Sequence, residues 1–158
     1  MMDERVFTRA AGEYGKRLYV VAYRLLGNRA DAEDAVQRTL MKCFAARASY
    51  SPQWAVSTWL YRVLSNVCID ELRRRRTWSK IAPPPQDVPA GAVDRLDVAR
   101  ALERVPREAR VLLALHYVDG LSYAELAKIR GISVNTVKSQ LARGKAIMRA
   151  ALGSGRTA

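Results

Sequence analysis

The stretch "ELAKIRGISVNTVKSQL", residues 125–141, contains two short helical patterns joined at Gly131. Glycine readily adopts the positive φ that reverses a chain tightly, and Ser133 is a favourable N-cap for a second helix. Within that helix, Val137 and Leu141 are four residues apart and therefore share one face, which we expect to point inward. The stretch predicts a helix-turn-helix.

The outer face of the second helix carries side chains that can donate or accept hydrogen bonds. Four basic side chains and no acidic one lie between residues 133 and 149, whereas a merely solvated helix usually mixes both signs. We therefore predict a recognition helix in the major groove of DNA; an ordinary helical hairpin is the alternative. The predicted DNA-facing residues of this helix are Asn135, Thr136, Lys138, Ser139, Gln140 and Arg143.

His116 stands near the end of the helix that precedes this motif. One interpretation makes it a partner for the C-terminal dipole of its own helix. The other makes it a phosphate contact beside the recognition helix, and on this interpretation it joins the DNA-facing residues. Pro106 predicts either the start of this helix or a tight break in the chain rather than a helix interior, because only the first turn of a helix tolerates a residue without an N–H group.

The overall composition restricts the class of protein. The 158 residues are 49% hydrophobic and 27% charged, with a formal net charge of +12. This predicts a globular protein of one medium or two small domains, with nucleic acid or an anionic membrane surface as its partner. No apolar run approaches the roughly 20 residues that span a bilayer, and the N-terminus lacks the apolar segment of a signal peptide. We expect a cytoplasmic protein without membrane insertion.

Residues that commonly carry catalysis or bind metal are scarce. Cys43 and Cys68 are isolated, and we expect free thiols buried in helices rather than a disulfide. With one histidine in the chain, a metal site built on His and Cys is nearly excluded. Phosphate-binding loops, dinucleotide-binding glycine motifs and serine-hydrolase motifs are also absent from the sequence. We predict no metal, no cofactor and no enzymatic activity.

The sequence predicts an all-α fold. Ala, Leu and Arg dominate, and apolar residues recur at helical spacing over residues 6–26 and 31–47. A third helix is expected to start near Ser57 and to end in four consecutive arginines. Residues 82–93 hold four prolines and a glycine, a composition that neither a helix nor a core strand tolerates.

We therefore predict two small helical modules joined by a Pro-rich linker. The modules are residues 1–76 and 94–158, the linker is residues 77–93, and the second module is the helix-turn-helix. The first module holds 14 basic and 8 acidic side chains, and the second holds 12 and 6. Because both are net basic, both are expected to meet the same kind of anionic partner.

Aromatic and arginine side chains gather in the second half of the first module. Tyr50, Trp54, Trp59 and Tyr61 alternate with polar residues, and the arginine run follows. Unpaired bases stack on aromatic rings while arginines hold the phosphates, so the pattern is typical of single-stranded DNA binding. The alternative is that Trp59 and Tyr61 are core residues.

Three segments together resemble a known family. Residues 23–44, 57–76 and 101–152 are similar, in this order, to parts of bacterial extracytoplasmic-function sigma factors. The resemblance covers nearly the whole chain on both sides of the linker. It implies a promoter-specificity subunit of RNA polymerase, in which the first module docks on the polymerase and opens the −10 element and the second reads the −35 element.

The resemblance also assigns residues to partners. It implies contacts with the clamp helices and flap of core RNA polymerase, with promoter DNA, and with an anti-sigma factor. The residues that it places against polymerase are Asp31, Asp34, Gln37, Arg38 and Met41. Those that it places at the −10 element, together with the aromatic loop, are Tyr50, Ser51, Gln53, Trp54, Arg62, Asn66, Arg73, Arg74, Arg75 and Arg76.

The chain departs from the family pattern at two positions. Arg38 stands where the family often has an acidic residue, and Gly144 stands where alanine is commoner, which is expected to weaken the last helix slightly.

Two other functions fit part of the sequence. One is a helix-turn-helix regulator that acts without core polymerase; the other is a sigma-like decoy that binds polymerase or a regulator without starting transcription.

Overall fold

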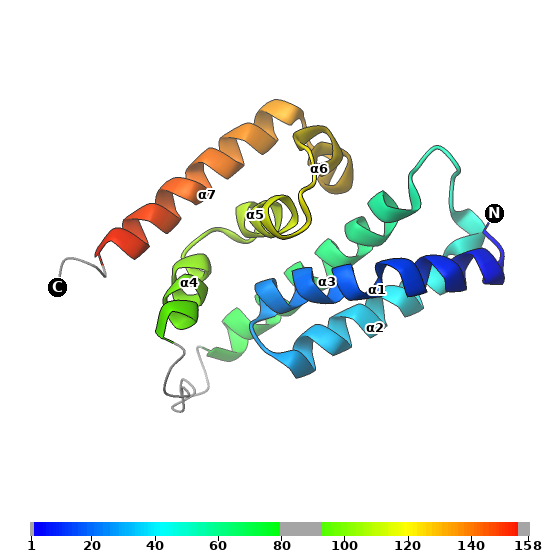
Figure 1. The fold of residues 1–158 in the computed structure, drawn as a ribbon, viewed down its shortest axis with the longest axis horizontal. Coiled ribbons are helices and arrows are strands. Elements are labelled where there is room, and N and C mark those ends of the chain that lie inside the picture. Colours follow the sequence, from blue (N-terminus) through cyan, green and yellow to red (C-terminus); the bar gives the residue numbers. More distant parts are fainter. Residues whose placement is uncertain (1, 80–92, 155–158) are drawn as a thin grey trace.

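The computed structural model describes residues 2–79 and 93–154, and within these ranges it contains α-helices, one short 3-10 helix and no β-strand (Figure 1). The predicted all-α fold is confirmed. The elements are α1 (Glu4–Leu26), α2 (Arg29–Ala45), η1 (Arg47–Ser49), α3 (Val56–Ser79), α4 (Val93–Glu103), α5 (Arg107–Asp119), α6 (Tyr123–Arg130) and α7 (Val134–Ser154).

The predicted linker, residues 77–93, lies mostly outside the described residues. At its two ends, α3 continues to Ser79 and α4 begins at Val93. The third helix thus runs beyond the arginine run, where the sequence analysis ended it. The physical reason is local, because residues 77–79 contain neither proline nor glycine and nothing in them stops a helix that is already formed.

Helices α1, α2 and α3 form the N-terminal module. Gly27 ends α1 with a φ of +80° and donates its N–H to Tyr23 O at 2.7 Å, and Asn28 caps α2 by accepting from Asp31 N at 2.9 Å. The resulting hairpin packs against α3. Its core consists of fully buried aliphatic side chains that include Leu18, Val21, Leu60, Leu64 and Val67.

The predicted helix-turn-helix is present in the C-terminal module. Gly131 has a φ of +66°, and Ser133 Oγ accepts a hydrogen bond from Thr136 N at 3.1 Å, so it caps α7. Val137 and Leu141 are buried at 0% and 1% exposure, as their spacing predicted. Pro106 stands at the N-cap of α5, also as expected.

The two modules pack directly against each other. Helix α5 contacts α1 and α3, and α6 contacts α3. Figure 1 shows α5 and α6 between the N-terminal module and α7, which lies on the far side of the molecule from α1 and α2. The buried side chains of both modules therefore belong to one continuous hydrophobic cluster.

Gly144 is buried where α7 crosses α5. A Cβ atom at this position would lie 2.9 Å from Leu113 Cδ1 and 3.4 Å from Val105 Cγ1. From the sequence, a glycine here predicts only a slightly weaker helix. The structure adds a compensating reason for the glycine, because it allows a close helix crossing.

We expect Gly144→Val to lower the free energy of unfolding by about 1–3 kcal/mol, because overpacking a filled core forces side chains and backbone to shift. Gly153→Val is the matched control, since Gly153 lies in the same helix and a Cβ there would meet no atom within 4 Å. Urea unfolding followed by circular dichroism measures both. Equal losses in the two variants would mean that helix propensity, not packing, explains Gly144.

Candidate nucleic-acid and polymerase interfaces

The first turns of α7 present the predicted recognition face. Asn135, Thr136, Lys138, Ser139 and Arg143 are exposed, and Gln140 is half-buried. The Thr136 hydroxyl also hydrogen-bonds Ser133 Oγ at 2.9 Å, so this side chain helps to hold the helix start. The buried residues of α7 fix the orientation of the helix, and its outer surface combines amide, hydroxyl and basic groups, which suit base edges and phosphates.

His116 closes the turn between α5 and α6. It lies in the last turn of α5, and its Nδ1 is 2.8 Å from Leu121 O. The ring is half-buried, with the Tyr117 and Tyr123 rings centred 4.9 and 5.3 Å away. These contacts favour the local role over the phosphate contact, which stays a prediction.

The aromatic loop is held against the start of α3. The Tyr50 hydroxyl donates to Trp54 O, and the Tyr50 ring packs on Trp59 with 5.0 Å between centroids. The Arg62 guanidinium lies 5.3 Å from the centroid of Trp54. Trp54 and Arg62 therefore place an aromatic ring and a cation side by side. Tyr50 holds the loop in place through its contacts with Trp54 and Trp59.

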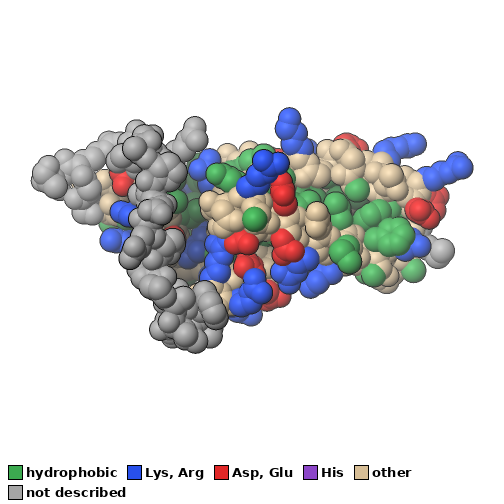
Figure 2. All heavy atoms as spheres, turned by 90° about the horizontal axis from the view of Figure 1, so that it is seen from below, with side chains coloured by type: hydrophobic (Ala, Val, Ile, Leu, Met, Phe, Trp, Pro, Cys, Tyr) green, Lys and Arg blue, Asp and Glu red, His purple; other side chains and the backbone are tan. Residues whose placement is uncertain are grey.

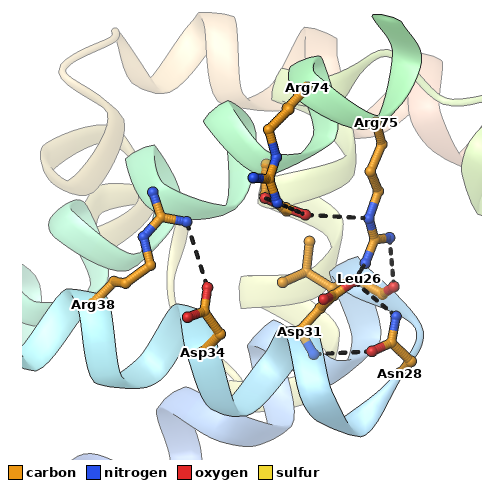
Figure 3. Close-up of polar contacts among 8 residues, drawn as sticks. Leu26, Asn28, Asp31, Asp34, Arg38, Arg74 and Arg75 are labelled. Atoms are coloured by element: carbon orange, nitrogen blue, oxygen red, sulfur yellow. Dashed lines mark hydrogen bonds and ion pairs between the residues drawn. The ribbon is translucent and has the colours of Figure 1, made fainter. Parts of the chain in front are cut away.

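The four consecutive arginines of α3 make different contacts, and Figure 3 shows two of them, Arg74 and Arg75. Arg75 turns inward, where it donates to Leu26 O at 2.6 Å and pairs with Asp31 and Glu71. It therefore ties α3 to the end of α1 and the start of α2. The other three side chains, Arg73, Arg74 and Arg76, are exposed.

We expect Arg75→Gln to lower the free energy of unfolding by about 1–3 kcal/mol, because the Leu26 carbonyl and two carboxylates lose their charged donor. Arg73→Gln is the control, since its ion pair with Asp70 spans 3.9 Å at the surface. Such pairs contribute about 1 kcal/mol or less. Chemical unfolding of both variants measures the difference, and equal small losses would contradict the structural role of Arg75.

Helix α2 carries the predicted polymerase-facing residues. Asp31 is engaged by Asn28 and Arg75, which together lower its pKa against the opposing effect of burial. Asp34 and Arg38 form an exposed ion pair at 3.6 Å, Gln37 is exposed, and Met41 is 71% exposed. Two residues predicted for different partners, Asp31 for polymerase and Arg75 for DNA, thus contact each other.

The underside of the molecule, near α2, differs in composition from the outer face of α7. Figure 2 views the molecule from below and shows acidic and basic side chains beside one another, with a group of hydrophobic side chains near them. Alternating charges and exposed apolar atoms suit a protein partner better than a phosphate backbone. The arrangement is consistent with the predicted use of α2.

The residues that join the two modules were not predicted from the sequence. Asp119, the last residue of α5, pairs with Arg17 of α1 and accepts a hydrogen bond from Tyr61 of α3. Arg130 of α6 donates to Asn66 Oδ1 at 3.0 Å. One signal was present in the sequence, because an acid at a helix C-terminus opposes the helix dipole and needs a compensating partner.

Comparison with known families covers both modules. Residues 11–77 match Sigma-70 region 2, and residues 95–148 match Sigma-70, region 4. The sigma factor SigM of Mycobacterium tuberculosis is 31% identical over 156 residues, covering 96% of this chain and 79% of SigM. The chain belongs to the extracytoplasmic-function (ECF) sigma factors. It is therefore a subunit that binds RNA polymerase and directs it to promoters.

Other relatives belong to the same family. The ECF sigma factor SigW of Bacillus subtilis is 28% identical, with 93% of this chain and 89% of SigW covered. SigE of Mycolicibacterium smegmatis is 31% identical over 149 residues. The match covers 87% of the present chain and 58% of the length of SigE.

Two solved structures resemble this sigma factor over most of its length. The sigma factor RpoE from Bartonella quintana, in complex with the anti-sigma factor NepR, has a TM-score of 0.73 and 26% identity, covering 93% of this chain and 96% of RpoE. CnrH in complex with the cytosolic domain of CnrY shares the fold, with a TM-score of 0.74 and 24% identity, covering 96% and 90%. Below, α1–α3 are called region 2 and α4–α7 region 4.

Across residues 2–79 and 93–154, no helix combines the length and apolar character that a bilayer crossing requires.

Proposed function

We propose that this sigma factor grips promoters at two points, with α7 in the major groove of the −35 element and the aromatic loop and α3 at the −10 element. The observation that carries the proposal is the face of α7. Lys138 and Arg143 are exposed there among amide and hydroxyl side chains, and no acidic residue lies on the described part of this helix. A face of this kind supports both phosphate positioning and base readout.

At the −10 element, Trp54 and Arg62 are proposed to hold an unpaired base. The indole offers a stacking surface, and the guanidinium lies near its ring, an arrangement that binds single-stranded DNA with little dependence on sequence. Asn66 and the exposed arginines Arg73, Arg74 and Arg76 would contact the neighbouring DNA. Base capture and the binding energy of the polymerase would together supply the melting energy, with no nucleotide hydrolysis by this chain.

The polymerase contact is proposed to lie on α2, against the clamp helices, with region 4 on the flap. Met41 supports this assignment because it is the most exposed of the large hydrophobic side chains in the described residues, and an exposed methionine suits a protein interface. Gln37 lies one turn before it and is also exposed. The sigma factor would act in the cytoplasm, where bacterial RNA polymerase works.

An anti-sigma factor is the proposed regulator. Two similar structures support this proposal, because RpoE is in complex with the anti-sigma factor NepR and CnrH is in complex with the cytosolic domain of CnrY.

The test is in vitro transcription with purified core polymerase on a library of promoter fragments. The expected result is a set of active promoters that share two sequence elements at a fixed spacing. Core binding without transcription from any fragment would favour the sigma-like decoy instead. Sequence-specific DNA binding without any core binding would favour a regulator that acts alone.

A further inference from the structure

The segment before α1 is anchored to η1, the short helix that precedes the aromatic loop of residues 50–55. Met2 is 4% exposed, and its N–H donates to Arg47 O at 3.1 Å. The same carbonyl oxygen accepts a hydrogen bond from Tyr50 N at 3.3 Å. Figure 1 shows the start of α1 beside the chain that connects α2 to α3. One carbonyl therefore joins the beginning of region 2 to the beginning of the loop.

A pair of aromatic rings supports η1 from the side of α2. The Phe7 ring meets the Phe44 ring edge to face, with 5.3 Å between centroids. The Arg47 guanidinium lies 3.9 Å from the centroid of Phe44 and donates to Phe44 O at 2.8 Å. Phe7 is 7% exposed and belongs to the hydrophobic core of region 2. Arg47 is therefore held both by its backbone and by its side chain.

The short helix η1 depends on these outside contacts. Within the described residues, none of its three side chains is fully buried and no side chain caps it. A 3-10 helix also has poorer hydrogen-bond geometry than an α-helix, and every residue of a free segment loses conformational entropy when it is ordered. The contacts from Met2 and Phe44 therefore fix the position of η1.

The position of η1 determines that of the aromatic loop. Tyr50 follows η1 directly, its hydroxyl donates to Trp54 O, and its ring packs on Trp59. Trp54 N donates in turn to Ser51 O at 3.1 Å. A binding site that is already ordered loses less conformational entropy when its ligand binds. An indole that is held in place therefore binds a base more tightly than a mobile one.

We propose that four residues around η1 form a brace that positions the aromatic loop for base capture at the −10 element: Met2, Phe7, Phe44 and Arg47. They are positioning residues, because they hold Trp54 through η1 and need no contact with DNA. The role of the brace in base capture rests on the proposed function. Its role in ordering the loop does not, because that role depends only on contacts within region 2.

The first experiment measures the order of the loop without DNA. Amide hydrogen exchange of residues 47–54 is followed by mass spectrometry in the full chain and in the variants Met2→Gln and Phe7→Leu. The first variant places an unpaired amide where Met2 is buried, and the second removes the ring that meets Phe44. We expect exchange to become about threefold faster or more in each, because local opening of the loop becomes easier.

Two further variants serve as controls for hydrogen exchange. Met2→Leu keeps an apolar side chain of similar volume and should retain the slow exchange of the wild type. Leu25→Ala removes a side chain that is 5% exposed in the same hydrophobic cluster, near the other end of α1. It should leave exchange in the loop unchanged although it destabilises the core. Unchanged exchange in both brace variants, or equal acceleration in Leu25→Ala, would overturn the brace.

The second experiment asks whether the brace acts through Trp54. Met2→Gln and Phe7→Leu are each combined with Trp54→Ala, and permanganate footprinting measures the open complexes formed with core polymerase on an active promoter. We expect each brace variant alone to form about threefold fewer open complexes or less, since the loop must then be ordered on binding. In the Trp54→Ala background we expect no further loss, because residues that act through one another are not additive.

The outcomes separate the brace from the proposed function. No loss of open complexes in either single variant, or the same further loss with and without Trp54, would overturn the role of the brace in base capture. Wild-type levels of open complexes in Trp54→Ala itself would show that the proposed −10 function is wrong, and the role in base capture would fall with it. Hydrogen exchange would then still decide whether the brace orders the loop.

Discussion

Replacing both Lys138 and Arg143 by alanine is expected to weaken binding to a −35 duplex by about 100-fold or more, because each base or phosphate contact of this type contributes about 1–3 kcal/mol. Both side chains are exposed on α7, above the buried Val137 and Leu141 that fix the helix. Fluorescence anisotropy with an active promoter fragment, at fixed salt, measures the affinity. Binding to core polymerase should not change, because neither residue is among those assigned to polymerase.

The control for this prediction removes the same charge elsewhere. Lys128 of α6 and Arg149 of α7 are exposed and lie outside the predicted base-reading residues. Their double replacement should reduce affinity for all DNA sequences alike, through the loss of about one released counterion per cation. If both double variants lose the same affinity and the same discrimination between promoter and random DNA, the recognition-helix assignment is wrong.

Replacing Trp54 by alanine is expected to reduce open-complex formation by about 10–100-fold, since stacking a base on an aromatic ring contributes about 1–3 kcal/mol. Closed-complex binding should fall much less, because duplex DNA offers no unpaired base to stack. Permanganate footprinting measures the opened bases, and gel shift at low temperature measures the closed complex. Equal loss at both steps would count against base capture by Trp54.

Tyr50→Phe separates the support of the loop from the stacking surface. This variant keeps the ring that packs on Trp59 and removes the hydroxyl that donates to Trp54 O. We expect an intermediate loss of open complexes, because Trp54 keeps its ring but is held less firmly. Trp54→Phe should retain most activity if a stacking surface is what the site requires.

The structure divides the predicted −10 residues into two groups. Arg75 and Tyr50 are used within region 2, where they hold the helix ends and the loop. Arg62 and the other three arginines are exposed, and Trp54 is half-buried beside Arg62. From sequence alone the four arginines were equivalent, and the stabilising role of Arg75 emerged only from its contacts with Leu26 and Asp31.

Several elements could be predicted from the sequence because their causes are local. Gly27 and Gly131 adopt the left-handed backbone that ends a helix, and Ser133 and Pro106 start the next ones. Helical spacing identified the buried face of α7. These features depend on residues within about one helical turn of each other, so a short stretch of sequence contains all of the relevant partners.

Other features were decided by the tertiary structure. Asp119 meets Arg17, 102 residues earlier in the chain, and Tyr61, 58 residues earlier. Helix propensity alone disfavours Gly144, whereas its closeness to Leu113 in the fold gives it a role in packing. Contacts between residues so far apart leave no periodic pattern in the sequence.

The sequence by itself therefore determined the helices, their caps, the helix-turn-helix and the family resemblance. Only the tertiary structure decided which charged side chains form ion pairs and hydrogen bonds within the protein and how the two modules meet. The physical reason is that a helix depends on hydrogen bonds between near neighbours, whereas the cost of a buried charge depends on whatever partners the fold brings to it.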